Sequence, residues 1–226
     1  KDVSWDNFYL QIEAMLKALA ASNKEIILLM PTLPSPTSQK IITDFISKYP
    51  NIRPVVYDTI SSDAALNSFE KYYGKRALAD YDFSKAKTIV SIDADFLGDW
   101  QGGGYEAGYA VSRIPNQNHG KAEMSQHFQF ESNMSLTGAN ADYRIPCTPA
   151  DQKNILAYIH DRLIGNITGQ LSENLKSNAD KAIAALKKSG SKGVLVSGIE
   201  DEIAQAIVLA INSHLDSEAF IPESPK

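Results

Sequence analysis

The stretch Lys87-Thr88-Ile89-Val90-Ser91-Ile92-Asp93 is the clearest β-strand of the chain, and it decides the fold class. Its apolar run is nearly continuous, which is typical of a parallel-sheet strand covered on both faces. Residues 25–30 and 193–197 have the same character, and shorter strands are predicted at 53–57, 126–131 and 142–146.

Helical patterns lie between these strands. Parallel strands need long crossover connections, and a helix is the usual one. We therefore predict an α/β fold with a doubly wound, mostly parallel, Rossmann-like sheet and right-handed crossovers. The helices are expected at 4–21, 38–48, 62–73, a segment ending at 113, 151–163, 171–188 and 200–215.

Composition excludes several classes of protein. The chain has 226 residues, 43% of them hydrophobic, and a net charge of −5, so it has enough apolar residues for a core and lacks the basic field that binds nucleic acid. No apolar run approaches the roughly 20 residues that span a bilayer. The single cysteine, Cys147, forbids an internal disulfide or a cysteine-based cluster, and the four histidines lack zinc-site spacing. The chain starts at Lys1 without methionine, so we expect it to be a segment of a longer protein.

The candidate binding loops follow the strands, because open α/β sheets bind ligands beyond the carboxyl ends of their strands. After residues 25–30, the hydroxyls of Thr32 and Ser35 and the next helix N-terminus offer an anion site. A proline-stiffened, capped turn is the alternative. After the central strand, Asp93, Asp95 and Asp99 suit a divalent cation, a sugar hydroxyl or the capping of a turn, and without a metal they would repel a diphosphate.

A third polar loop follows residues 126–131. Ser132, Asn133 and Thr137 offer donors and acceptors for a pterin or nucleotide edge, or for a loop bonded to itself. No GxGxxG, P-loop or GxSxG motif is present, so no catalytic residue is assigned.

The order of these segments resembles the molybdopterin oxidoreductase superfamily along nearly the whole chain. The matching segments are residues 4–6, 83–93, 129–146, 148–151 and 193–198. A narrower resemblance, at residues 31–37, 56–58, 91–98 and 130–142, is to the molybdopterin-like region of the large iron–sulfur subunit of alternative complex III, a Tat-variant-translocated molybdopterin oxidoreductase.

The resemblance implies an exported protein on the periplasmic face, attached peripherally to a membrane complex. It also implies Fe–S clusters in another region of the same polypeptide, and cytochrome c and membrane subunits as partners in a quinol-oxidising respiratory chain. These relatives lack the molybdenum cofactor, so we expect none in this fragment and do not expect the fragment alone to be catalytic.

Three departures from the superfamily motifs agree with that expectation. Residues 91–93 replace G-x-N, residues 131–133 replace D-P-R, and residues 148–151 lose the glycine of P-G-T-D. Each change removes a glycine or a cation, or adds an acid, where a dianionic cofactor would bind. Thr32, Ser35, Asp93, Asp95, Ser132, Asn133 and Thr137 are thus expected to line a vestigial cleft.

Two alternatives stay open at this stage. One is a working fragment that binds molybdopterin guanine dinucleotide, and the other is a small-ligand-binding α/β domain without a redox role. From the superfamily's split-domain order, we also expect residues 1–50 and 176–226 to share one lobe and residues 51–175 to form another.

Overall fold

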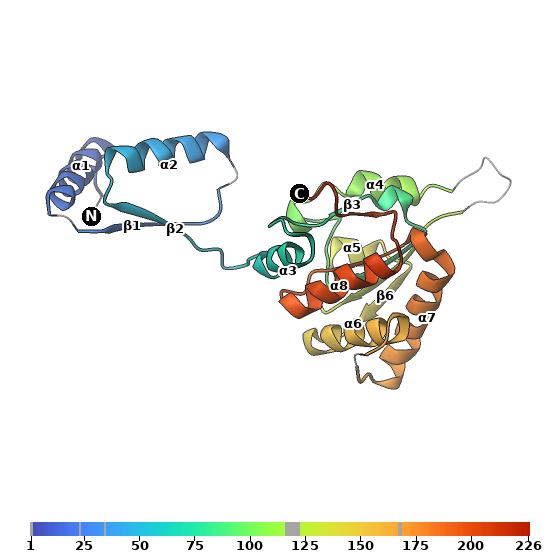
Figure 1. Ribbon diagram of the computed structural model, residues 1–226. Helices are drawn as coiled ribbons and strands as arrows, with labels where there is room; N and C mark the ends of the chain where they lie inside the picture. Colours follow the sequence, from blue (N-terminus) through green and yellow to red (C-terminus); the bar gives the residue numbers. More distant parts are fainter. Residues whose placement is uncertain (1, 23, 34, 116–122, 167–168) are drawn as a thin grey trace. The chain divides into compact units, whose positions relative to one another are not determined.

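The computed structural model describes residues 2–22, 24–33, 35–115, 123–166 and 169–226, and Figure 1 shows its helices and strands. The chain divides into two compact units, Lys1–Ser61 and Ser62–Lys226, which we call unit 1 and unit 2.

Unit 1 is a small βαβ arrangement preceded by a helix. β1 and β2 pair in parallel, with Ile26 opposite Ile52 and Met30 opposite Val56. The elements are α1 (Trp5–Ala21), β1 (Ile26–Met30), α2 (Pro36–Lys48) and β2 (Ile52–Val56).

Hydroxyl caps set the starts of both helices in unit 1. The Ser4 side chain accepts a hydrogen bond from the Asn7 amide, and the Ser35 side chain accepts one from the Ser38 amide. Helix α2 begins at Pro36, two residues before the predicted start. Proline suits the first turn of a helix because the N–H that it lacks would have no intrahelical partner there.

Unit 2 is built on a four-stranded parallel sheet in the order β6-β5-β4-β7. Every residue of β4 and β7 is buried, as their continuous apolar sequences predict. Ile89 lies opposite both His127 and Val194, so β4 is the central strand between β5 and β7. The strands are β4 (Thr88–Ile92), β5 (Gln126–Glu131), β6 (Tyr143–Pro146) and β7 (Gly193–Ser197).

Helices cover both faces of this sheet, and α4 and α6 lie on opposite sides of it in Figure 1. One apolar cluster includes Ile155 of α6 and Leu186 of α7, and the other includes Phe69 of α3 and Tyr109 of α4. The helices are α3 (Asp63–Tyr73), α4 (Glu106–Ser112), α5 (Leu136–Ala139), α6 (Pro149–Leu163), α7 (Glu173–Ser189) and α8 (Glu202–His214).

Short elements complete unit 2. An antiparallel pair, β3 (Asp80–Tyr81) and β8 (Phe220–Ile221), ties the end of the chain to the segment before β4. The 3-10 turns among the described residues are η1 (Phe83–Lys85), η2 (Trp100–Gly102) and η3 (Gly190–Lys192).

The outer edge of β7 is closed by a side chain of α8. The fully buried Asn212 amide donates to the Leu195 carbonyl at 2.7 Å and accepts from the Leu195 N–H at 2.9 Å. Asn212 therefore takes the place of a neighbouring strand at this position, which satisfies both backbone groups.

The predicted α/β class with parallel strands and crossover helices is confirmed. The observed division of the chain differs from the expected lobes, 1–50 plus 176–226 and 51–175. Residues 193–197 pair with β4, so the end of the chain shares the sheet of residues 88–146 and belongs to unit 2. Because β7 pairs with β4 along its whole length, residues 193–197 cannot belong to a lobe without residues 88–92.

Candidate functional site

The candidate site is the carboxyl edge of the four-stranded sheet. The chain passes from β4 to β5 to β6 and then returns to β7 on the other side of β4. The strand order thus reverses between β4 and β7, where doubly wound folds usually form a binding crevice.

Backbone closes the space between β4 and β7. The Gly198 N–H donates to the Ile92 carbonyl at 2.9 Å, and Asp93 has a φ of +59°. A Cβ added to Gly198 would lie 2.1 Å from the Asp93 carbonyl oxygen. The loops after the two strands are therefore in direct contact, and only glycine permits this approach.

Asp95 holds the next loop in place. Its carboxylate accepts from the Thr137 N–H at 3.0 Å and from the Thr137 hydroxyl at 2.7 Å. That hydroxyl in turn accepts from the Leu97 N–H at 2.9 Å. Thr137 is fully buried, so these two predicted site residues lie together but use their polar atoms on each other.

Glu131 is buried at the end of β5 and fully engaged. Its carboxylate accepts from Arg144 Nε at 2.5 Å, from the Ser135 hydroxyl at 2.6 Å and from the Gln129 amide at 3.2 Å. The sequence indicates that replacing D-P-R with residues 131–133 removes a cationic partner for a phosphate. Arg144 of the neighbouring strand is a cation at this edge, but its charge neutralises Glu131.

Asp93 is a third acid of the edge. Its side chain accepts from the Gln152 amide at 2.8 Å, and the residue is exposed. Partial burial of the carboxyl raises the pKa of Asp93, and the Glu131 charge adds to this rise, against the hydrogen bonds from Gln152 and the Ser132 N–H.

Cys147 lies near these acids, at the end of β6. Burial raises the pKa of its thiol to about 12, and the charges of Asp151, Asp93 and Glu131 act in the same direction. The thiol is therefore protonated at neutral pH, and it is not activated as a nucleophile.

Ser132 and Asn133 are exposed at the same edge, and no protein partner of their side chains is found among the described residues. They are near Asp93 through the Ser132 backbone. Asp93, Asp95, Ser132, Asn133 and Thr137 thus share one edge of unit 2.

Thr32 and Ser35 belong to the other compact unit. The Thr32 amide and hydroxyl donate to the Asp58 carboxylate at 2.8 and 2.5 Å, and the Ser35 hydroxyl caps α2. This is the capped turn that the sequence left as an alternative to an anion site. The two hydroxyls therefore already have partners within unit 1.

A row of buried polar side chains runs along β5 toward the candidate edge. His127 Nδ1 lies 3.2 Å from the Tyr109 hydroxyl, and His127 Nε2 lies 3.3 Å from Gln129 Oε1. Gln129 then donates to Glu131. Burial lowers the pKa of His127 to about 4, so its ring is neutral at neutral pH.

Sequence reasoning missed three residues that shape the edge: Arg144, Gln152 and Gly198. Arg144 and Gln152 are 13 and 59 residues from the acids they contact, and no local pattern links them. Gly198 did have a signal, because a glycine directly after a buried strand often marks close backbone approach.

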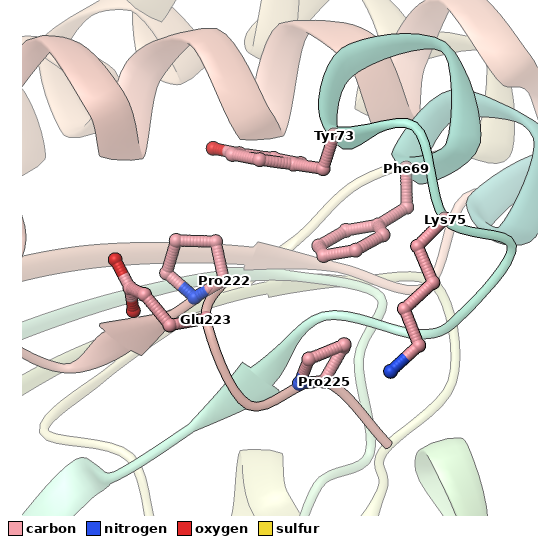
Figure 2. A pocket seen from close by; sticks show the side chains of 6 residues that line it. All are labelled: Phe69, Tyr73, Lys75, Pro222, Glu223 and Pro225. Atoms are coloured by element: carbon pink, nitrogen blue, oxygen red, sulfur yellow. The ribbon is translucent and has the colours of Figure 1, made fainter.

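Within the described ranges, no group of three or more His, Cys, Asp or Glu residues is arranged to hold a metal ion. No described helix is long and apolar enough to cross a membrane. Two cavities of unit 2 lie away from the sheet edge. One of about 270 Å³ is beside α3 (Figure 2), and one of about 560 Å³ lies on α7.

Comparison with known proteins shows a shared fold and no closer relationship. No protein family and no curated protein matches the sequence, whereas 14 chains of solved structures match the fold. One is in the formyltransferase/hydrolase complex from Methylorubrum extorquens, solved with methylofuran, with 13% identity, a TM-score of 0.54, and coverage of 91% of this chain and 55% of that one. Another is acetylene hydratase from Pelobacter acetylenicus, with 15% identity, a TM-score of 0.53, and coverage of 98% and 34%.

The chain thus spans little more than half of one of these structures and about a third of the other. At these identities the similarity concerns the fold alone.

Proposed function

We propose that this chain is a molybdopterin-oxidoreductase-like domain that acts as a scaffold in an electron-transfer protein and does not itself bind the molybdenum cofactor. The observation that carries this proposal is the state of the carboxyl edge. Asp93, Asp95 and Glu131 are each hydrogen-bonded to a protein side chain, and the loops that follow β4 and β7 are in contact.

The edge does not fit a pterin dinucleotide. The diphosphate of such a cofactor needs N–H donors or cations. Arg144 is committed to the buried Glu131, and Lys153 is paired with Asp201 at 2.7 Å. Asp93, with its exposed carboxylate, adds charge of the same sign as a phosphate.

The wider setting follows from the sequence resemblance. In this proposal the domain belongs to an exported iron–sulfur subunit on the periplasmic face, as in alternative complex III. It packs against the Fe–S region of its own polypeptide and contacts cytochrome c and membrane subunits of a quinol-oxidising complex. The subunit is peripheral and reaches the membrane through that complex.

The test is cofactor analysis of the full-length protein purified from its natural source. We expect molybdenum and tungsten far below one equivalent by mass spectrometry and no pterin fluorescence after oxidative extraction. A molybdoenzyme prepared in parallel is the positive control. Stoichiometric metal together with pterin would overturn the proposal and favour a working cofactor-binding fragment.

The scaffold role needs a second measurement. Crosslinking of isolated membranes followed by peptide identification should join this domain to an Fe–S region and to cytochrome c subunits. Crosslinks to neither, in a preparation whose other respiratory complexes crosslink normally, would contradict the role.

One observation favours a second candidate function, the binding of a small ligand. The cavity beside α3 has rigid ring-bearing walls and lies in unit 2, apart from the sheet edge (Figure 2).

A further inference from the structure

The cavity beside α3 is formed by an arch in the last residues of the chain. Ile221 pairs with Asp80, and further on the Lys226 and Leu78 backbones exchange hydrogen bonds of 2.9 and 3.1 Å. Between these two anchors the tail has residues 222–225, whereas the facing strand has only Ala79. The surplus residues must therefore arch away from the facing strand.

The arch is held at its far end and stiffened along its length. Lys226 Nζ donates to the Gly103 carbonyl at 2.6 Å and lies 3.9 Å from the centre of the Tyr105 ring. Pro222 and Pro225 fix two of the backbone φ angles in the arch. The wall of the cavity is thus formed before any ligand arrives, which reduces the entropy lost on binding.

The opposite wall is aromatic. Phe69 is almost completely buried and Tyr73 is partly exposed, with their ring centres 4.7 Å apart. The Tyr73 hydroxyl lies 3.2 Å from the Ser213 hydroxyl, which fixes the ring. In Figure 2 these two rings and the two proline rings surround one space.

The size of the cavity limits what it can hold. Pockets for drug-sized ligands measure about 300–1,000 Å³, and this one has about 270 Å³. It therefore suits one flat ring between the aromatic and proline walls, and it is too small for a dinucleotide.

Charge at the rim defines the ligand further. Lys75 lines the cavity, and its ammonium lies beside Pro225, whereas Glu223 lies on the other side, beyond Pro222 (Figure 2). Neither side chain has an ion-pair partner among the described residues. Lys75 is the cationic group at the rim, and its charge favours an anion there against the partial negative charge at the end of α3.

We propose that this cavity binds a small aromatic carboxylate. Its ring lies between the wall of Phe69 and Tyr73 and the wall of Pro222 and Pro225, and its carboxylate pairs with Lys75. This site is separate from the sheet edge and does not depend on the scaffold role.

The test is ligand-observed NMR and calorimetry on the full chain with benzoate, benzyl alcohol and benzylamine at neutral pH and low salt. For a ligand of this size we expect benzoate to bind with a dissociation constant on the order of 1 mM. Benzyl alcohol should bind more weakly and benzylamine most weakly, because only benzoate pairs with Lys75.

Variants separate the charge from the ring contacts. Lys75→Gln should weaken benzoate binding about fivefold and leave benzyl alcohol unchanged. Tyr73→Leu should weaken both ligands, since it removes one of the two rings of the aromatic wall. Lys188→Gln, which removes the same charge from the exposed side of α7, should change neither, and thermal melts of each variant check folding.

Three outcomes would overturn the proposal. They are no binding of benzoate up to its solubility limit, equal binding of all three compounds with no effect of Lys75→Gln, and preferred binding of benzylamine that Glu223→Gln abolishes.

Discussion

Units 1 and 2 have similar sequence patterns, but only in unit 2 is the sheet covered on both faces. In unit 2, β4 and β7 are buried along their whole length and helices cover both sheet faces. In unit 1, α1 and α2 contain no buried residue, and Tyr49 and Ile52 are its only buried apolar side chains among the described residues.

The difference lies in how many layers each unit can supply. A sheet of two strands is at best marginally stable alone, whereas more strands packed on helices form a core. Unit 1 leaves large apolar side chains exposed, for example Trp5 at 72% and Leu29 at 65%. Apolar patterning alone therefore makes a strand, and burial on both faces makes that strand stable.

The two tryptophans allow each unit to be followed separately, because Trp5 lies in unit 1 and Trp100 in unit 2. Trp5→Phe leaves a reporter of unit 2, and Trp100→Phe leaves a reporter of unit 1. Substitutions in unit 2 are measured in the Trp5→Phe protein and those in unit 1 in the Trp100→Phe protein. The pairs are given from the largest expected effect to the smallest.

The largest contrast should come from two ion pairs. Glu131→Ala leaves Arg144 without its carboxylate partner. It should lower the unfolding free energy by about 3–5 kcal/mol, because Glu131 is only 2% exposed. Glu25→Ala breaks an exposed pair with Arg53 and should cost less than about 1 kcal/mol. Urea denaturation measures both, and equal costs would contradict the distinction between the units.

Two leucines at strand positions test the cores. Leu195→Ala removes a fully buried side chain of β7 and should cost about 2–5 kcal/mol. Leu29→Ala in β1 should change the stability by no more than about 0.5 kcal/mol, since its side chain is mostly exposed. A large cost at Leu29 in the Trp5 signal would show that unit 1 has a covered core in solution.

The third prediction concerns pH. Folding lowers the pKa of His127 from 6.5 to about 4, so the unfolded chain binds a proton first as the pH falls. Unit 2 should lose roughly 3 kcal/mol between these pH values, with no further loss from this group below them. The raised pKa values of Asp93 and Glu200 act in the opposite direction.

The difference between the wild type and His127→Gln isolates this effect from the other groups. Melts at pH 7, 5.5 and 4 span the window between the two pKa values of about 6.5 and 4, and over it the wild type should lose roughly 3 kcal/mol relative to the variant. Unit 1 contains no histidine and should show no such step in the Trp5 signal. Parallel pH profiles for the two proteins would refute the prediction.

Helix caps should give the smallest effects. Asp201→Ala removes the bond that its carboxylate accepts from the Ala204 amide at 3.0 Å, at a cost of about 1 kcal/mol. Ser4→Ala removes a longer cap bond of 3.4 Å in α1 and should cost less. The reverse order in urea denaturation would mean that cap geometry does not decide these costs.

The regular elements were largely predictable, and the site was not. Residues 88–92 and 193–197 were expected as buried strands because both faces of each are apolar. The start of α2 at Pro36 was missed although proline is common there. The contacts Asp95–Thr137 and Asp93–Gln152 join residues 42 and 59 positions apart, and only the assembled sheet brings them together.

The expectation that the edge repels a cofactor rested on counting acids in the sequence. The structure alters its physical basis, because Glu131 is neutralised by Arg144, while Asp93 keeps an exposed carboxylate. Side chains from neighbouring strands change the electrostatics of a loop, and the sequence of the loop itself does not reveal these contacts.

The hydrogen bonds of the Asn212 amide to β7 affect how the protein associates at high concentration. A strand of a second molecule that approaches this edge finds the Leu195 groups already occupied, and at the other edge β6 has four residues and ends in Pro146, which has no N–H. Growth of the unit 2 sheet into fibres is therefore blocked at one side by an amide and hindered at the other by proline. Concentrated samples of unit 2 should resist intermolecular β-assembly for as long as α8 stays folded.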